Sequence, residues 1–349
     1  MSSQVLNASG DALHQPVLRE LCVRLFDNVS RYERPVLIDG TLGMGGHTEA
    51  FLTAYPNLTV IGIDRDPEAI SLANERLQVF GNRFHAVHAT YDQISQVWSG
   101  FQANNDQAAG DSEFALAGIF LDLGVSSLQL DQQERGFSYA HDAPLDMRMN
   151  QQESLTAAEI LAKADKAELI RILREFGEEK FAGQIAQEIV RARAVKPLES
   201  TFELVDLVRK ALPAAAMRQG GNPAKRTFQA LRIAVNRELQ ILKNAIETAI
   251  ELLPIGSRLV VESYQSLEDR IVKTAFKSGL HSSTPLGLPI ELSDHQAFLK
   301  ELVRGAYKAD AAEIAQNSRS ASVRLRAVER IRQTPNHFQT QTKTGRGGR

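Results

Sequence analysis

Cysteine is nearly absent from this sequence, and so are the marks of secreted and membrane proteins. The chain has one cysteine, Cys22, which excludes an internal disulfide and a zinc site built from several thiolates. Segment 1–11 is polar and lacks an apolar signal-peptide core, and no stretch of roughly 18 apolar residues occurs anywhere. We therefore expect a protein of the reducing cytoplasm that makes no contact with a membrane.

An excess of charge of one sign is missing as well. The net charge of -2 creates no overall basic field, so any signal for nucleic acid has to be local. The strongest one lies at the C-terminal end, where residues 319–349 hold eight Lys or Arg and one acid, Glu329. Such a run is typical of a solvated surface or of an RNA contact, and the sequence leaves both open.

A glycine-rich loop is the most informative segment. Residues 36–47 read VLIDGTLGMGGH, which predicts a buried strand, a tight turn and the start of a helix. Glycine lets backbone amides approach a ligand closely, and a helix N-terminus offers free N–H groups to negative charge. The order G-x-x-G-x-G-G departs from the dinucleotide pattern G-x-G-x-x-G.

A second apolar strand, at 58–64, ends in Asp64. An acid at the tip of the second parallel strand can accept hydrogen bonds from two vicinal ribose hydroxyls. The loop and Asp64 together indicate an adenosine cofactor without a pyrophosphate. The alternative is a glycine-rich turn beside a surface aspartate.

Further apolar strands are expected at 84–88 and 116–122. Because these strands alternate with helical segments, the sequence predicts an α/β fold with a doubly wound, mostly parallel sheet. Ligands bind at the carboxyl ends of the strands in such sheets. Asp39, Asp64 and Asp122 should therefore converge.

The remaining elements follow from apolar spacing and end signals. We expect a first helix that opens at Pro16 and buries Cys22, a long helix from Lys225 to Leu253, and a helix capped by Ser266. The other expected elements are helices at 48–54 and 67–79, a surface loop at 100–113, and strands at 258–263, 298–306 and 322–330.

Between the fourth strand and the long helix the pattern becomes helical. Thr156-x-x-Glu159 and Ser200-x-x-Glu203 are capping boxes, and a Gly- and Asn-containing loop follows at 217–223. We therefore expect an inserted helical domain that holds the substrate. The expected boundaries are a cofactor-binding domain at 14–130 and 225–332, the insertion at 131–224, and flexible ends at 1–13 and 333–349.

Seven motifs, in order along residues 14–330, resemble those of the bacterial 16S ribosomal RNA cytosine-N4 methyltransferases, the RsmH or MraW family. They occupy segments 38–47, 63–67, 121–127 with 129–131, 134–138, 144–149, 226–233 and 266–270. The resemblance implies a class I S-adenosylmethionine methyltransferase with a Rossmann-like sheet. It implies methylation of the N4 amine of a cytosine in the decoding centre of 16S ribosomal RNA, within the small ribosomal subunit.

The expected cofactor residues follow from the loop and from the family motifs. They are Asp39, Gly43, Gly45, Gly46, His47, Asp64, Tyr91, Asp122 and Gln129. Tyr91 stands where the family usually has Phe, and Gln265 stands where it commonly has His. No residue at metal-ligand spacing accompanies His47, so no metal is expected.

Methyl transfer to cytosine N4 needs an acceptor for the amino protons, because the N4 lone pair is conjugated into the ring. Asp122 is the best placed by sequence, although it can instead hold the cofactor or cap the turn at Gly124. Asp146 is the second candidate.

The expected RNA contacts are aromatic rings for the flipped base and cations for phosphates. The aromatic residues are Phe137, Tyr139 and Tyr264, and the cations are Arg135, Arg148, Lys225, Arg226 and Arg232. For each aromatic residue, ordinary packing is an equal alternative.

Two other functions remain open at this level. One is an RNA-binding scaffold of the same fold with little or no catalysis. The replacement of the family histidine by Gln265 is consistent with this alternative. The other is an NAD-linked oxidoreductase, which the missing G-x-G-x-x-G disfavours. The sequence also leaves open the oligomeric state, a homodimer included, and whether naked RNA or an assembled subunit is the substrate.

Overall fold

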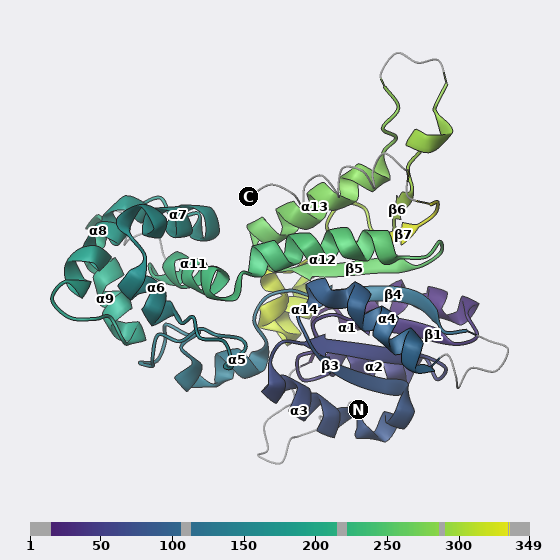
Figure 1. Ribbon diagram of the computed structural model, residues 1–349, viewed down its shortest axis with the longest axis horizontal. Coiled ribbons are helices and arrows are strands. Elements are labelled where there is room, and N and C mark those ends of the chain that lie inside the picture. The colour runs from purple at the N-terminus through teal and green to yellow at the C-terminus, as the bar shows by residue number, and fades with distance from the viewer. Residues whose placement is uncertain (1–14, 106–112, 215–221, 286–289, 334, 336–349) are drawn as a thin grey trace. The chain divides into compact units, whose positions relative to one another are not determined.

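The computed structural model in Figure 1 describes residues 15–105, 113–214, 222–285, 290–333 and 335. The chain divides into two compact units, which we call the sheet unit (Met1–Gly124 with Ile241–Arg349) and the helical unit (Val125–Gln240). The predicted flexible start at 1–13, nearly all of the predicted tail at 333–349 and parts of two predicted loops, 106–112 and 217–221, lie outside the described residues.

The sheet unit is built on one sheet. In the described residues its strand order is β3-β2-β1-β4-β5-β7-β6; β1 to β5 are parallel, and β7 runs antiparallel to both β5 and β6. The strands are β1 Pro35–Asp39, β2 Thr59–Asp64, β3 Phe84–His88, β4 Ala115–Asp122, β5 Arg258–Ser263, β6 Leu299–Glu301 and β7 Arg324–Arg330. The predicted α/β class and mostly parallel sheet are confirmed.

Helices cover both faces of this sheet because its apolar residues alternate between them. Val36 and Ile38 pack with one set of helices, while Leu37 packs with the other. The first set is α4 Ile94–Asn105, α12 Glu238–Leu252 and α13 Ser266–Leu280; the second is α1 Arg19–Leu25, α2 Gly46–Ala54 and α3 Pro67–Leu77. Short helices complete the unit: η1 Asp27–Arg31, η2 Gln78–Arg83, η3 Tyr91–Gln93, η5 Ser293–His295, α14 Ala311–Gln316 and η6 Ser318–Ser322.

The helical unit packs amphipathic helices around a core of its own. Its elements are α5 Ser127–Asp131, η4 Gln133–Arg135, α6 Ala157–Lys163, α7 Lys166–Gly177, α8 Ala182–Arg193, α9 Thr201–Ala211 and α11 Lys225–Asn236. Both predicted capping boxes are present, at Thr156 and Ser200.

The predicted continuous helix from Lys225 to Leu253 is wrong. Arg237 has φ 51°, a left-handed conformation that ends α11 before α12 begins. Phe228 and Leu231 of α11 belong to the core of the helical unit. The units therefore divide after Gln240, whereas the sequence placed this boundary before Lys225. The first division, after Gly124, lies six residues before the expected position at 130.

Three predicted helix ends also differ. The first helix begins at Arg19 instead of Pro16, because Leu18 is left-handed with φ 47°. Helix α4 continues to Asn105, inside the predicted loop, since it buries Phe101. Gln265, and not Ser266, is the N-cap of α13, with its N–H donated to Glu268 Oε2 at 3.0 Å. Among the described residues, no helix has the length and apolar character needed to cross a membrane.

Candidate active site

The glycine loop joins β1 to α2 at the carboxyl ends of the strands. Gly43 and Gly45 have φ 51° and 79°, where residues with a Cβ are strained. A Cβ on Gly45 would lie 2.8 Å from Leu77 Cδ1, whereas one on Gly43 would meet only the Thr41 carbonyl, at 4.0 Å. The loop therefore packs tightly against α3 at Gly45 and leaves open space at Gly43, as the approach of a ligand requires.

Asp39, at the end of β1, is 1% exposed and serves the loop itself. Its Oδ1 accepts the Thr41 N–H at 3.1 Å, and its Oδ2 accepts the Thr48 hydroxyl at 2.7 Å. Burial raises the pKa of Asp39 to about 7, against the lowering effect of these two hydrogen bonds. Asp39 holds the loop in place, and its predicted contact with a cofactor stays a prediction.

Asp64, at the end of β2, binds the same loop from the other side. Its Oδ2 accepts the Gly43 N–H at 2.8 Å, and its Oδ1 accepts the Asp66 N–H at 2.9 Å. Burial raises the pKa of Asp64, and these N–H donors oppose that rise. A further backbone hydrogen bond from Arg65 acts on the same carboxylate, and the predicted contact of Asp64 with ribose hydroxyls stays a prediction.

Tyr91 begins η3 just after β3 and is half-buried. A Cβ on Gly40, the first residue of the glycine loop, would lie 3.1 Å from Tyr91 Cβ. The Cβ of Tyr91, whose ring is predicted to contact the adenine, therefore lies beside the loop. Gly46 and His47 form the first turn of α2, and a Cβ on Gly46 would lie 2.9 Å from Pro16.

Asp122 ends β4 and lies opposite Glu262 of β5 in the sheet register. Its N–H donates to Thr41 Oγ1 at 2.6 Å, which links it to the loop that Asp39 and Asp64 hold. The strand ends thus converge through the glycine loop. The Asp122 side chain is 29% exposed, so it remains accessible to a ligand.

The Tyr264 hydroxyl donates to Asp122 Oδ1 at 2.8 Å. Burial and the charge of Asp122 hold the pKa of Tyr264 well above its usual range, so the phenol keeps its proton and acts as the donor. Burial raises the pKa of Asp122, whereas His47 and the Tyr264 hydrogen bond lower it. The sequence suggested Tyr264 as a stacking surface and missed this hydrogen bond.

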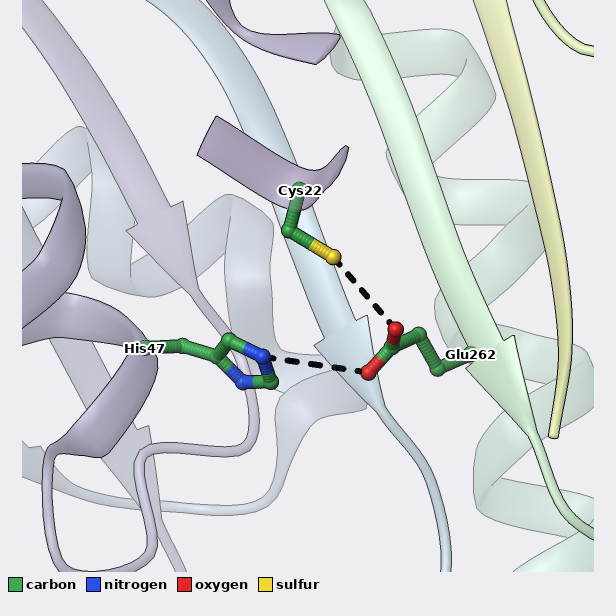
Figure 2. Close-up of side chains that lie close together, drawn as sticks. All are labelled: Cys22, His47 and Glu262. Atoms are coloured by element: carbon green, nitrogen blue, oxygen red, sulfur yellow. Dashed lines mark hydrogen bonds and ion pairs between the residues drawn. The ribbon is translucent and has the colours of Figure 1, made fainter. Parts of the chain in front are cut away.

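Behind Asp122 lies a buried cluster of Cys22, His47 and Glu262, whose side chains point toward one another in Figure 2. The Cys22 thiol donates to Glu262 Oε1 at 3.4 Å. His47 Nε2 lies 3.9 Å from Glu262 Oε2 and 2.9 Å from the Val17 carbonyl oxygen. Glu262 was not predicted, although an acid within the apolar strand LVVES was a signal.

The types of these three side chains match those that bind zinc. Their ligand atoms lie within 4.8 Å of one another, and no other such group occurs in the part of the chain that the structure describes. Burial raises the pKa of Cys22 and of Glu262 well above their usual values and lowers that of His47. All three shifts favour the neutral forms, and Glu262 Oε2 is buried without a hydrogen-bond partner; the predicted absence of a metal stays a prediction.

In the helical unit, Arg135 is 1% exposed, with Nη2 donating to the carbonyl oxygens of Arg148 at 3.1 Å and Met149 at 2.7 Å. The buried guanidinium therefore ties two backbone carbonyls of its own unit together, and the predicted RNA contact of Arg135 stays a prediction without support from this geometry.

Asp146 and Arg148 form a bidentate ion pair, with N···O distances of 2.8 and 2.6 Å. Burial alone would raise the pKa of Asp146, but the bonds from Arg148 outweigh it and hold the pKa below its usual value. A carboxylate with a low pKa is a poor proton acceptor. The geometry therefore favours Asp122 over Asp146 as the base and leaves the Arg148 guanidinium engaged.

The other predicted RNA residues fall into two groups. Phe137 is 8% exposed in the core, Tyr139 packs edge-on against Phe228 at 5.7 Å, and Arg232 pairs with Glu238 through two contacts of 2.9 Å. Lys225 and Arg226 instead lie exposed in the first turn of α11, and neither has an ion pair within the described residues.

Gln129 is 4% exposed, and its side-chain oxygen accepts the Ser126 N–H at 3.1 Å, which closes the capping box of α5. Its expected contact with the cofactor stays a prediction.

Comparison with known proteins shows the family to which the chain is similar. The model of the MraW methylase family matches residues 11–331. The protein named ribosomal RNA small subunit methyltransferase H of Beutenbergia cavernae is 54% identical over 329 residues, covering 94% of this chain and 96% of its own. The protein of the same name from Mycolicibacterium gilvum is 54% identical over 321 residues, covering 92% and 84%.

A solved rRNA methylase from Streptococcus thermophilus aligns with 92% of this chain and 100% of its own, at 11% identity and a TM-score of 0.38, a likeness too low to support an inference. The match of the family model and of near-full-length relatives is decisive: the chain belongs to the MraW methylase family.

Proposed function

We propose that this protein methylates the exocyclic N4 amine of a cytosine in the decoding centre of 16S ribosomal RNA. The methyl donor is S-adenosyl-L-methionine, and the relatives at 50–54% identity are named ribosomal RNA small subunit methyltransferases. One observation supports the chemistry most: Asp122, partly exposed at the end of β4, is hydrogen-bonded to Tyr264 and tied to the glycine loop.

The residues at the carboxyl ends of the strands fit the cofactor. The open space at Gly43 allows backbone approach, and Asp64, at the end of β2, is the acceptor that we assign to the ribose hydroxyls. Tyr91 lies beside the loop, where its ring can contact the adenine. Acidic residues at this end of the sheet also favour a ligand that carries positive charge.

S-adenosyl-L-methionine supplies a methyl group on a positively charged sulfur. The N4–carbon bond forms as the sulfur–carbon bond breaks, and N4 then releases one proton. The protein's first contribution is to align donor and acceptor, since orientation removes much of the entropic barrier. Its second is to accept the proton from N4.

Asp122 is the group to which we assign that second task. A carboxylate that accepts a hydrogen bond from an N4 proton localises the nitrogen lone pair and can then take up the proton. Burial raises the pKa of Asp122 toward the working pH, which strengthens it as a base. Tyr264 fixes Oδ1, and Oδ2, which lies 3.8 Å from His47 Nδ1, is the oxygen that we assign to the N4 proton.

The test uses the full chain, labelled S-adenosyl-L-methionine and small subunits that lack their decoding-centre methylations. The RNA is digested to nucleosides and separated by mass spectrometry. We expect N4-methylcytidine, and a loss of roughly 100-fold or more in rate for Asp122→Asn with the cofactor dissociation constant nearly unchanged. Asp146→Asn is the matched control and should retain the rate at saturating RNA.

Methyl on another nucleoside or another atom overturns the proposed reaction. Equal loss of cofactor binding and rate in Asp122→Asn removes the assignment of Asp122 as the base. Tight cofactor binding without any transfer points to the RNA-binding scaffold, and Gln265→His is then the informative variant, because it restores the residue common in the family.

A further inference from the structure

A basic groove lies within the helical unit. It has a volume of about 560 Å³ and is formed by α7, α8, α9 and the turn before α8. Its lining residues are Lys166, Arg174, Lys180, Gly183, Gln184, Gln187, Glu188, Arg191, Lys210 and Ala211. Five cations and one carboxylate give this lining a net formal charge of +4, in a chain whose total is -2.

Most of this charge is not neutralised inside the protein. Glu188 pairs with Arg191 at 2.6 Å, and Lys166 donates to the neutral Gln187 side chain at 2.6 Å. The exposed side chains of Arg174, Lys180 and Lys210 have no ion pair within the residues that the structure describes.

Several other cations of the helical unit do have ion pairs. Arg171 on α7 binds Glu168 at 2.8 Å and Glu175 at 2.6 Å. Lys163 pairs with Glu159 at 2.7 Å, Lys196 with Glu203 at 2.6 Å, and Arg209 with Asp206 at 3.5 Å. Clustered cations without counter-charges repel one another, and a bound polyanion relieves this repulsion.

The lining also indicates which part of a polyanion fits. It contains no aromatic side chain on which a base can stack. Gln184 and Gln187 can donate to phosphate oxygens or sugar hydroxyls, and the small residues Gly183 and Ala211 leave room for a chain to pass. These groups suit contacts to a sugar-phosphate backbone, which position a nucleic acid without reading its sequence.

We propose that this groove binds the sugar-phosphate backbone of the RNA substrate and does not bind the target base. Arg174, Lys180 and Lys210 are the principal phosphate ligands. The proposal rests on RNA being the substrate, as set out under the proposed function. None of the cations predicted from the family motifs lines this groove.

The test compares two triple variants of the full chain that change charge equally. The groove variant carries Arg174→Gln, Lys180→Gln and Lys210→Gln; the control carries Lys163→Gln, Arg171→Gln and Arg209→Gln, all at exposed positions. Binding to deproteinised 16S RNA and to small subunits is measured by filter binding over a series of salt concentrations, alongside cofactor binding and thermal unfolding.

Each lost phosphate contact reduces the slope of log K against log salt by about 0.7 to 0.9, so the groove variant should lose about 2 to 3. Its affinity should approach that of the unmodified protein near about 1 M salt and fall about 100-fold or more below it at about 0.1 M. The control should keep both slope and affinity, and both variants should bind cofactor normally.

The proposal is overturned if the salt slope of RNA binding is unchanged in the groove variant, or if the control variant loses as much slope and affinity as the groove variant. Loss of affinity for subunits but not for free RNA also overturns it, because the groove then contacts a protein. If the unmodified protein transfers no methyl group but the groove variant loses salt slope as expected, the proposed function is wrong and the groove proposal is supported. If the protein transfers the methyl group but the groove variant and the unmodified protein have the same salt slope, only the groove proposal is wrong.

Discussion

The hydrogen bond from Tyr264 to Asp122 makes a quantitative prediction about the pH dependence of methyl transfer. Tyr264→Phe removes the hydroxyl that donates to Asp122 Oδ1 at 2.8 Å and keeps the ring. Because that hydrogen bond lowers the pKa of Asp122, its loss raises the pKa further. A larger share of Asp122 is then protonated at any given pH and is unable to act as a base.

The size of this effect follows from the strength of the bond. A hydrogen bond to a charged group contributes about 1.5–3 kcal/mol. Asp122 is 29% exposed, so solvent screening favours the lower end of this range. Since about 1.4 kcal/mol corresponds to one pKa unit, the pKa of Asp122 should rise by about one unit.

The assay is the pH profile of kcat/KM for methyl transfer to small subunits, with the cofactor dissociation constant measured at each pH. In Tyr264→Phe the acid limb should move up by about one unit, with a rate loss of about tenfold at acid pH that diminishes toward alkaline pH. Tyr139→Phe is the control, because that ring packs against Phe228 and the change should leave the limb in place. An unmoved acid limb in Tyr264→Phe, with intact cofactor binding, would refute the assignment of Asp122 as the titrating base.

Two further predictions concern stability. In Glu262→Gln, an isosteric neutral side chain replaces an acid whose folded-state pKa lies well above the usual value, so the folded chain holds a proton that the unfolded chain releases above about pH 4.3. The stability contribution of native Glu262 is therefore complete below that pH and is lost as the pH rises toward its folded-state pKa. Urea unfolding at a series of pH values should show the free energy of unfolding of Glu262→Gln rising relative to that of the native protein as the pH increases. A difference between the two free energies that does not change with pH would contradict this. Asp269 binds Arg326 at 2.7 Å and Arg324 at 3.1 Å, and although burial opposes it, these bonds hold the pKa of Asp269 below its usual value. Asp269→Asn should lower the free energy of unfolding by about 3 kcal/mol at pH 7, and by less as the pH falls through the folded-state pKa of Asp269. Asp206→Asn, at an exposed ion pair, should lower it by under about 0.5 kcal/mol. Equal losses of unfolding free energy in the two variants would be inconsistent with a buried pair at Asp269.

The sheet and the ends of its strands could be predicted because their signals are local. An apolar run that ends in an acid occurs at Asp39, Asp64 and Asp122, and the structure places all three at the carboxyl ends of parallel strands. The glycine spacing likewise predicted a loop, and Gly43 and Gly45 have the positive φ angles that the loop needs. These features depend on residues close together in the chain.

The partners of charged side chains could not be predicted, since they come from distant segments or from the backbone. Arg135 resembles a phosphate ligand in sequence, yet it donates to two carbonyl oxygens in its own core. Glu262 lies 240 positions from its thiol donor, Cys22. The break at Arg237 was missed because a left-handed arginine carries no glycine or proline signal.

The charges of the two units suggest how cofactor and RNA are bound by different surfaces. The carboxyl ends of β1, β2, β4 and β5 carry Asp39, Asp64, Asp122 and Glu262. Glu262 is held in its neutral form, but Asp39, Asp64 and Asp122, where they are ionised, favour a positively charged cofactor and repel phosphates. Affinity for a polyanion must therefore come from other surfaces, and of the cations predicted for that role, Arg135, Arg148 and Arg232 are engaged inside the helical unit. The groove cations and the exposed Lys225 and Arg226 remain to attract the RNA backbone, so mutations there should weaken RNA binding without changing the methylated atom.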